Sequence, residues 1–189
     1  MKKLIAVLAF AGLSLSGFAQ DATPTEKYSV STNSFWSNWF VQAGINWNAW
    51  YSNEEHGQNF ATSPFKKFRS NPGVSVAIGK WFTPGIGLRT KLQGIWGKQV
   101  YDMATGEQGK FNKYWLLNEH VLFNVSNLLY GYNENRVWNV IPFVGGGIGR
   151  TMTHNLYSMD LCAGVQSSWK VAEKLNVYLE AGWNRIEHD

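Results

Sequence analysis

The residues best suited to chemistry in this chain of 189 residues are its four histidines. They are His56, His120, His154 and His188, and Ser52, Ser158 and Glu187 lie near three of them in the sequence. A histidine beside a serine and a carboxylate is the arrangement that many hydrolases use. Nearness in sequence does not make a triad, however, and no nucleophile elbow is present. We therefore expect no enzyme activity and no catalytic residues.

Metal and cofactor sites are not predicted either. The histidines are scattered and Cys162 is the only cysteine, so no pair has the spacing of metal ligands. The glycine-rich run 145–149 is not followed by Gly-Lys-Ser/Thr and does not resemble a phosphate loop. We expect these glycines to relieve crowding between strands, and we expect no cofactor.

Four charged residues form a more defined constellation. Arg89 and Lys91 occupy alternate positions of one segment, on the same face as its polar residues, and Asp160 and Glu180 occupy the polar faces of two others. Lone charges are costly to bury, so opposite signs are expected to pair. We predict a structural ion network of these four residues. The alternative is that each charge is hydrated separately near a rim.

These charged residues belong to an alternation of apolar and polar residues with a period of two, and this alternation continues along most of the chain. In residues 39–51, seven successive alternate positions are apolar, and this strand is more than twice the mean length of about 5–6 residues. Six further strands are indicated near residues 74–79, 86–97, 115–125, 137–150, 159–169 and 175–184. The polar segments 52–72 and 98–112 are predicted to be long loops.

Composition limits the class of protein. Charged residues make up 16%, against about 25% in soluble domains, and an aromatic content of 15% excludes a disordered chain. Outside the N-terminus no apolar run approaches the roughly 18 residues of a spanning helix. The formal charge of +4 includes Lys2 and Lys3; without them it is 15 against 13, or +2. No basic cluster is present, so nucleic acid is not an expected partner.

The N-terminus has the parts of an export signal. Lys2 and Lys3 precede an apolar stretch, and Gly17 and Ala19 place small residues before a cleavage site. We predict a signal peptide at residues 1–19 and a flexible periplasmic leader at 20–37. Residues 38–189 are then one domain.

The composition of the two strand faces favours a membrane barrel over a soluble sandwich. The polar face consists mostly of Gly, Ser, Asn and Gln, which suit the lumen of a small barrel. The apolar face carries aromatic residues near strand ends, where Trp and Tyr prefer the membrane interface. These predicted interface residues are Trp39, Trp47, Tyr51, Trp96, Trp115, Trp169 and Trp183. The fold class is therefore all-β, a small up-and-down antiparallel transmembrane β-barrel.

Closure sets a further condition. An open sheet edge in lipid leaves backbone groups unpaired, and single-chain bacterial barrels have even strand numbers. Only seven strands are readable here. The missing strand is expected to follow Asp189 in a longer protein, so that this sequence is truncated; segment 27–36 or another chain are the alternatives.

Two motifs resemble a known family. Residues 79–89, GKWFTPGIGLR, and 141–149, IPFVGGGIG, look like the OmpA-type outer-membrane β-barrel domains of Bacteroidetes. Residues 122–128 and 131–133 fit the same family, and the likeness covers nearly all of residues 36–187. The resemblance implies an eight-stranded barrel in the bacterial outer membrane, often followed by a periplasmic peptidoglycan-binding domain. The final strand and that domain are not found in this sequence, so cell-wall tethering is not carried over.

The expected function is structural. Such a barrel stabilises the envelope, contacts outer-membrane lipid and lipopolysaccharide, and presents loops 52–72 and 98–112 to extracellular ligands. The alternatives are an outer-membrane lipid-modifying enzyme with a histidine-based site at the outer rim, or a narrow diffusion pore. The sequence favours no oligomeric state.

Overall fold

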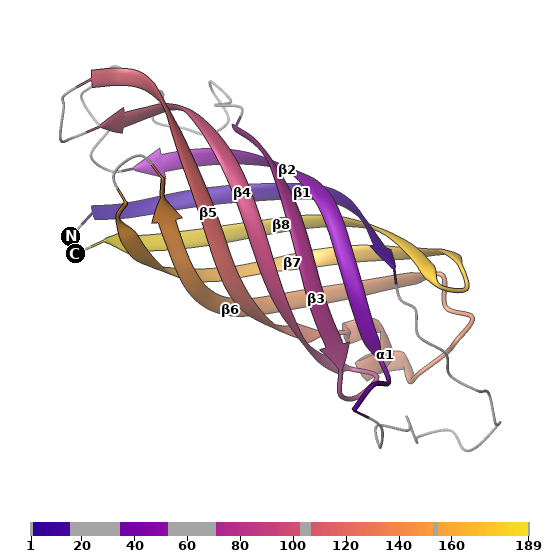
Figure 1. Cartoon of the computed structure of the whole chain (residues 1–189). Helices are drawn as coiled ribbons and strands as arrows, with labels where there is room; N and C mark the ends of the chain where they lie inside the picture. Colours follow the sequence, from indigo (N-terminus) through magenta and orange to yellow (C-terminus); the bar gives the residue numbers. More distant parts are fainter. Residues whose placement is uncertain (1, 16–34, 53–70, 103–106, 153–154, 189) are drawn as a thin grey trace.

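The chain forms a closed barrel of eight antiparallel strands in a computed structural model (Figure 1). The structure describes residues 2–15, 35–52, 71–102, 107–152 and 155–188, and the side chains of most of them from Phe35 onward. The strands are β1 (Lys2–Leu15), β2 (Trp39–Ser52), β3 (Asn71–Trp81), β4 (Ile86–Asp102), β5 (Glu107–Phe123), β6 (Trp138–Thr151), β7 (Tyr157–Ala172) and β8 (Leu175–His188). A six-residue helix, α1 (Val125–Tyr130), lies between β5 and β6.

Each strand pairs with its sequence neighbours, and β1 pairs with β8 to close the ring. Closure provides ladder partners for the backbone groups on both sides of every strand, as a wall in lipid requires. Among the described residues no helix is long and apolar enough to cross a membrane. The predicted all-β, up-and-down barrel is confirmed.

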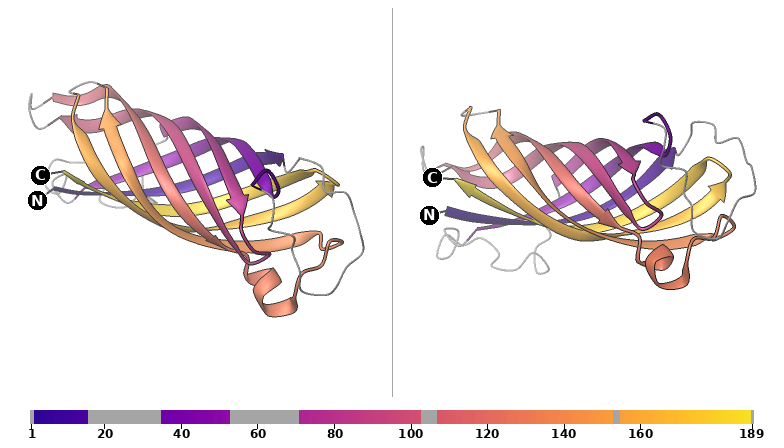
Figure 2. Two further views of the ribbon diagram at one scale, coloured as in Figure 1. Left: turned by 60° about the horizontal axis from the view of Figure 1, so that its bottom comes forward. Right: turned by 90° about the horizontal axis from the view of Figure 1, so that it is seen from below.

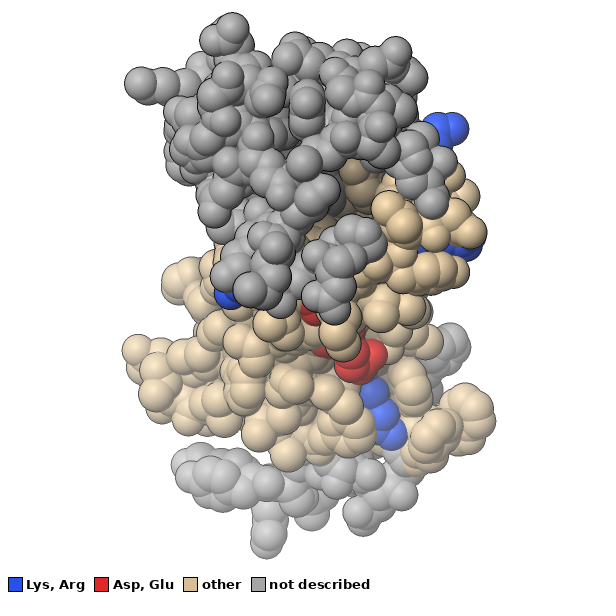
Figure 3. Space-filling view, turned by 90° about the vertical axis from the view of Figure 1, so that its left-hand side faces the viewer, with Lys and Arg blue, Asp and Glu red and all other residues tan. Residues whose placement is uncertain are grey.

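The outer surface of the wall is apolar. Along β3 and β4 burial alternates with each residue, so that one face is enclosed and the other exposed. The exposed face includes Val41, Ile45, Val74, Val76, Ile78, Leu88, Leu92, Leu117, Val144, Ile148, Leu161, Val165 and Leu179. In the view of Figure 3, charged side chains are few among the described atoms. An apolar outer face on the described strands from β2 to β8 is a surface suited to lipid.

The strand that closes the barrel, β1, is not one of the segments that the sequence was expected to supply for closure. It is the segment predicted as a signal peptide, and it runs antiparallel to both β2 and β8. Its sequence lacks the period-two alternation of the other strands, and the register pairs Leu8 and Phe10 with Asn48 and Asn46, which face the lumen. Residues 2–15 cannot both be cleaved as a signal peptide and remain as a strand of the same mature protein. The signal peptide stays a prediction.

The boundaries of one predicted loop are wrong. Most of segment 98–112 belongs to strands, because β4 continues to Asp102 and β5 begins at Glu107. The pairing continues there through register shifts after Gly97 and after Val100. Bulges of this kind let a ladder extend through residues that break the alternation. In the other predicted loop, 52–72, Ser52 ends β2 and residues 71–72 begin β3, and residues 53–70 lie outside the described residues.

The two ends of the barrel differ in their connections. One end, here named the turn end, carries the connections 82–85, 124–137 and 173–174, which follow β3, β5 and β7. The loop end carries the connections 53–70, 103–106 and 152–156, and both chain termini lie there (Figure 1). Periplasmic turns of outer-membrane barrels are typically short, as 82–85 and 173–174 are, so we expect the turn end to be the periplasmic one.

Intact-mass measurement of the protein isolated from outer membranes tests the fate of β1. We expect the mass of the chain without residues 1–19, because the segment has a basic start, an apolar core and small residues before the cut. Retention of these residues would contradict the signal peptide and make β1 a strand of the mature wall.

The barrel lumen as candidate functional site

An apolar layer fills the lumen at the turn end. It consists of Phe40, Leu122, Ile141 and Phe143, all buried, with Trp81 packed against them. These residues come from the turn-end parts of β2, β5, β6 and β3. The polar face of the strands was expected to consist mostly of Gly, Ser, Asn and Gln. At this end large apolar side chains instead occupy the described part of the lumen.

Two glycines in the wall make room for the rings of this layer. A Cβ atom on Gly79 would lie 2.2 Å from Cζ of Phe40, and one on Gly164 would lie 2.5 Å from Cζ of Phe143. Real Cβ atoms do not approach carbon that closely. The rings therefore take the space that wall side chains would otherwise occupy.

The next layer is an ion-pair cluster that crosses the lumen. Nη1 of Arg89 lies 2.7 Å from Oε2 of Glu180, and Nζ of Lys91 lies 2.6 Å from its Oε1. Arg89 is 0% exposed and Glu180 is 1% exposed. β4 and β8 are four places apart in a ring of eight, so these pairs connect opposite walls. One carboxylate thus ties together the two cations of β4.

Neutral side chains complete the coordination of Arg89. Its Nη1 also donates to Oε1 of Gln42 at 2.9 Å and to Oε1 of Gln166 at 2.8 Å. Nε2 of Gln42 donates to Oε1 of Gln166 at 3.2 Å. Because these residues lie on β2, β4, β7 and β8, the network braces four strands across the lumen.

His120 of β5 joins the same cluster as an acceptor. Nε of Arg89 donates to Nδ1 of His120 at 3.1 Å, and a guanidinium has no lone pair to offer in return. The proton of this imidazole is therefore on Nε2. Phe143 connects this layer to the apolar one, since its ring centroid lies 4.7 Å from that of His120 and 5.0 Å from Cζ of Arg89.

Asp160 lies apart from the ion pairs. It is buried, and its Oδ2 accepts hydrogen bonds from Asn118 at 2.6 Å and from Asn184 at 3.1 Å. The structure thus brings together three of the four charged residues predicted to form a network, and it places the fourth among amides. Asp160 and Glu180 balance Arg89 and Lys91 in formal charge, so the four buried charges sum to zero.

A second apolar layer lies toward the loop end. Ile95, Leu116 and Ile186 are buried together, with Tyr114 packed against them. Between the layers a small cavity is lined by Lys91, Gln93, Asn118, His120, Phe143, Glu180, Gly182 and Asn184. Its volume of about 10 Å³ is at the lower limit for a single water molecule. The described lumen is filled by side chains.

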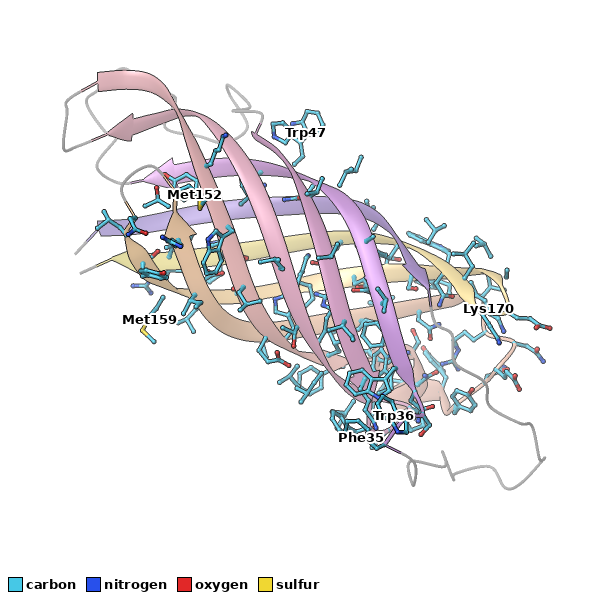
Figure 4. All side chains as sticks on the ribbon, in the orientation of Figure 1. Phe35, Trp36, Trp47, Met152, Met159 and Lys170 are labelled. Atoms are coloured by element: carbon cyan, nitrogen blue, oxygen red, sulfur yellow. The ribbon has the colours of Figure 1, made fainter. Side chains whose placement is uncertain are left out.

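The predicted interface aromatics are distributed between the two ends. Trp39 and Trp169 lie at the turn end, with the unpredicted Trp138 beside Trp169 in the register. Trp47 and Trp183 lie in the loop-end halves of their strands and Trp115 lies at the middle of β5, and Figure 4 shows Trp47 pointing away from the barrel. The side chains of Tyr51 and Trp96 are outside the description. The interface role of these residues stays a prediction.

The structure gives the position of Glu119, which interrupts an apolar face in the sequence. Its carboxylate is on the outer surface and Oε2 accepts a hydrogen bond from Oγ1 of Thr90 at 2.5 Å. The neighbouring position on β6 is Gly146, which leaves this side of the carboxylate open. The cross-strand hydroxyl partly satisfies a group that would otherwise face lipid unpaired.

The residues of the hydrolase alternative remain untested. His56 and His154 lie outside the described residues, and His188 and Glu187 lie in β8 without described side chains. Within the described part of the chain, no group of three His, Cys, Asp or Glu side chains is arranged to hold a metal ion.

Three residues of the Arg89 cluster were not predicted as members of the network, although their place on the polar face of the alternating pattern indicated that they point into the lumen. Gln42, His120 and Gln166 occupy the same faces as the predicted charges, so they were expected to point inward. Which of them touch Arg89 depends on strand register across the barrel, which alternation does not give.

Replacing Glu180 by Ala is expected to destabilise the barrel by about 3–5 kcal/mol, because Arg89 and Lys91 lose their buried carboxylate partner. Lys91→Met is the matched control. It keeps the Arg89–Glu180 pair and should cost clearly less. Urea-induced unfolding in lipid vesicles, followed by tryptophan fluorescence, measures both. Equal stability of the two variants and the parent would contradict a stabilising network.

Comparisons with known proteins agree with this architecture. No family model matches the chain. It is 27% identical over 161 residues to outer membrane protein 40 of Porphyromonas gingivalis (strain ATCC BAA-308 / W83), covering 79% of this chain and 39% of that protein. It is 25% identical over 199 residues to outer membrane protein 41 of the same organism, covering 96% and 48%. The chain spans less than half the length of these curated relatives. With a closed antiparallel wall, an apolar outer belt and these relatives, it is a β-barrel protein of the bacterial outer membrane, similar to those of Bacteroidetes.

Proposed function

We propose that the chain is a structural outer-membrane barrel of the OmpA type, which strengthens the envelope and has no catalytic activity. The observation that carries the proposal is the filled lumen. Two apolar layers enclose a buried ion-pair cluster, and the cavity between them is at most the size of a water molecule. A barrel filled in this way is stable but offers solutes no path.

The filling argues against the diffusion-pore alternative on energetic grounds. A hydrated solute would have to displace Phe143, Leu122 and their neighbours and separate the Arg89–Glu180 pair. Breaking one partner of such a buried pair costs several kcal/mol. Side chains that brace opposite walls thus favour rigidity over transport.

Surface presentation is the second part of the proposal. The segments named for ligand contact, 52–72 and 98–112, belong to the loop end, which we take as the extracellular end and which carries the long connection 53–70. Strands β4 and β5, with seventeen residues each, are the longest in the barrel and carry the second segment. Outer-membrane lipid and lipopolysaccharide are the proposed partners of the belt.

The structural role is tested in cells that lack the protein. We expect greater sensitivity to detergent, restored by the parent gene and by Lys91→Met, and restored less well by Glu180→Ala, which weakens the barrel itself. Full resistance without the protein would contradict an envelope role. Surface levels of each variant are measured alongside, so that poor assembly is recognised.

The pore alternative is tested in planar lipid bilayers. Purified protein, shown to be folded by its heat-modifiable migration, is expected to give no steady conductance, because both apolar layers must open for ions to pass. Steady single-channel currents in the parent protein would contradict the proposal.

The enzyme alternative is tested on lipid A. Mass spectra of lipid A from cells with and without the protein are expected to be identical. A mass change that disappears in His154→Ala or His188→Ala would instead favour a histidine-based site at the outer rim.

A further inference from the structure

We propose that α1 and the connection after it form an interfacial anchor that inserts Leu129 and Tyr130 into the phospholipid leaflet at the turn end. The feature that points to it is an inverted polarity. The polar side chains of this helical turn contact the barrel, whereas its large apolar side chains face away from it. A turn that faces water would have the opposite arrangement.

The polar side holds the helix firmly to the wall. Asn124 caps α1 by accepting from the backbone N–H of Asn127 at 3.1 Å. Nδ2 of Asn127 donates to the carbonyl of Pro84 at 2.8 Å in the β3–β4 turn. Oγ of Ser126 accepts from the backbone N–H of Val140 at 3.0 Å in β6. The position of α1 is therefore set by two neighbouring parts of the wall.

The apolar side is exposed despite this attachment. Leu129 is 70% exposed and Tyr130 is 80% exposed, and no residue of α1 is buried. Leu128 is 55% exposed and lies beside Gly85, and Val125 is half-buried. Burying a leucine side chain is worth about 1.5–3 kcal/mol. Transfer of Leu129 and Tyr130 from water into an apolar environment would therefore be favourable.

The position of the helix and a nearby positive charge indicate that a phospholipid leaflet covers the exposed apolar side chains of α1. In Figure 2, α1 lies at the turn end, to one side of the barrel strands. Arg136 is fixed beside it, donating to Oδ1 of Asn127 at 2.7 Å and lying 6.0 Å over the Tyr130 ring. An arginine next to interfacial apolar groups suits the phosphates of a phospholipid leaflet.

The opposite side of the same end carries a comparable arrangement. Phe35 and Trp36 are exposed there, and Nζ of Lys80 lies 5.0 Å over the Phe35 ring (Figure 4). In Figure 2 the segment that begins at residue 35 and helix α1 lie on different sides of the turn end. Aromatic and cationic groups thus recur around this end, as they do at the interface level of a bilayer.

Site-specific quenching tests the anchor in the full mature protein. Leu129→Cys is prepared in a Cys162→Ser background, labelled with an NBD fluorophore and reconstituted in vesicles of phosphatidylethanolamine and phosphatidylglycerol. The matched control is Glu134→Cys, an exposed polar position of the same connection whose described bond, from Lys170, involves only the backbone carbonyl. Lipids with a nitroxide high on the acyl chain and aqueous iodide serve as the two quenchers.

We expect the lipid nitroxide to quench the label at 129 at least threefold more strongly than at 134, and iodide to show the reverse order. Equal iodide quenching at both sites would overturn the proposal and leave a surface open to a protein partner. A label at 129 that neither quencher reaches would also overturn it, because the site would then be covered by protein. Tryptophan fluorescence and heat-modifiable migration establish that both variants are folded.

Discussion

The structure depends on one constraint, that no backbone N–H or C=O group within lipid is left without a partner. A sheet meets it only by closing on itself, and in this structure β1 closes the ring by pairing with both β2 and β8. If residues 1–19 are cleaved as expected, another segment or chain must take the place of β1. Closure with eight strands encloses a narrow lumen, and its width limits the size and polarity of the side chains that can point inward. The apolar belt, the filled interior and the short turns are consequences of the same requirement.

Within the lumen the problem is reversed, because charge has to be satisfied without bulk water. Glu180 neutralises two cations of the opposite wall, and Gln42, Gln166 and His120 take the remaining donors of Arg89. Apolar layers on both sides limit the access of bulk water to this cluster, which strengthens its electrostatic interactions and raises the cost of breaking them. The same filling underlies both the stability of the barrel and the impermeability that we propose for it.

The turn end shows how the outer surface is adapted at the boundary of the bilayer. There the wall stops, yet apolar side chains continue outward on α1. The helix is held in place by a hydrogen bond from Asn127 to the β3–β4 turn and by one that Ser126 accepts from Val140 of β6. Cationic side chains lie beside them. The division of polar and apolar faces that is found in the wall thus recurs in a six-residue helix.

The sequence by itself determined the fold class, the outward face and the inward position of Arg89, Lys91, Asp160 and Glu180, because alternation is a local property of a strand. Only the tertiary structure decided which of them meet. Arg89 and Glu180 are 91 residues apart and Asp160 lies among amides, since contacts across the lumen depend on the relative register of eight strands. The apolar layers, with Phe40 paired to Gly79, and the strand that fills the place between β2 and β8 were likewise settled by ring closure, which no local pattern encodes.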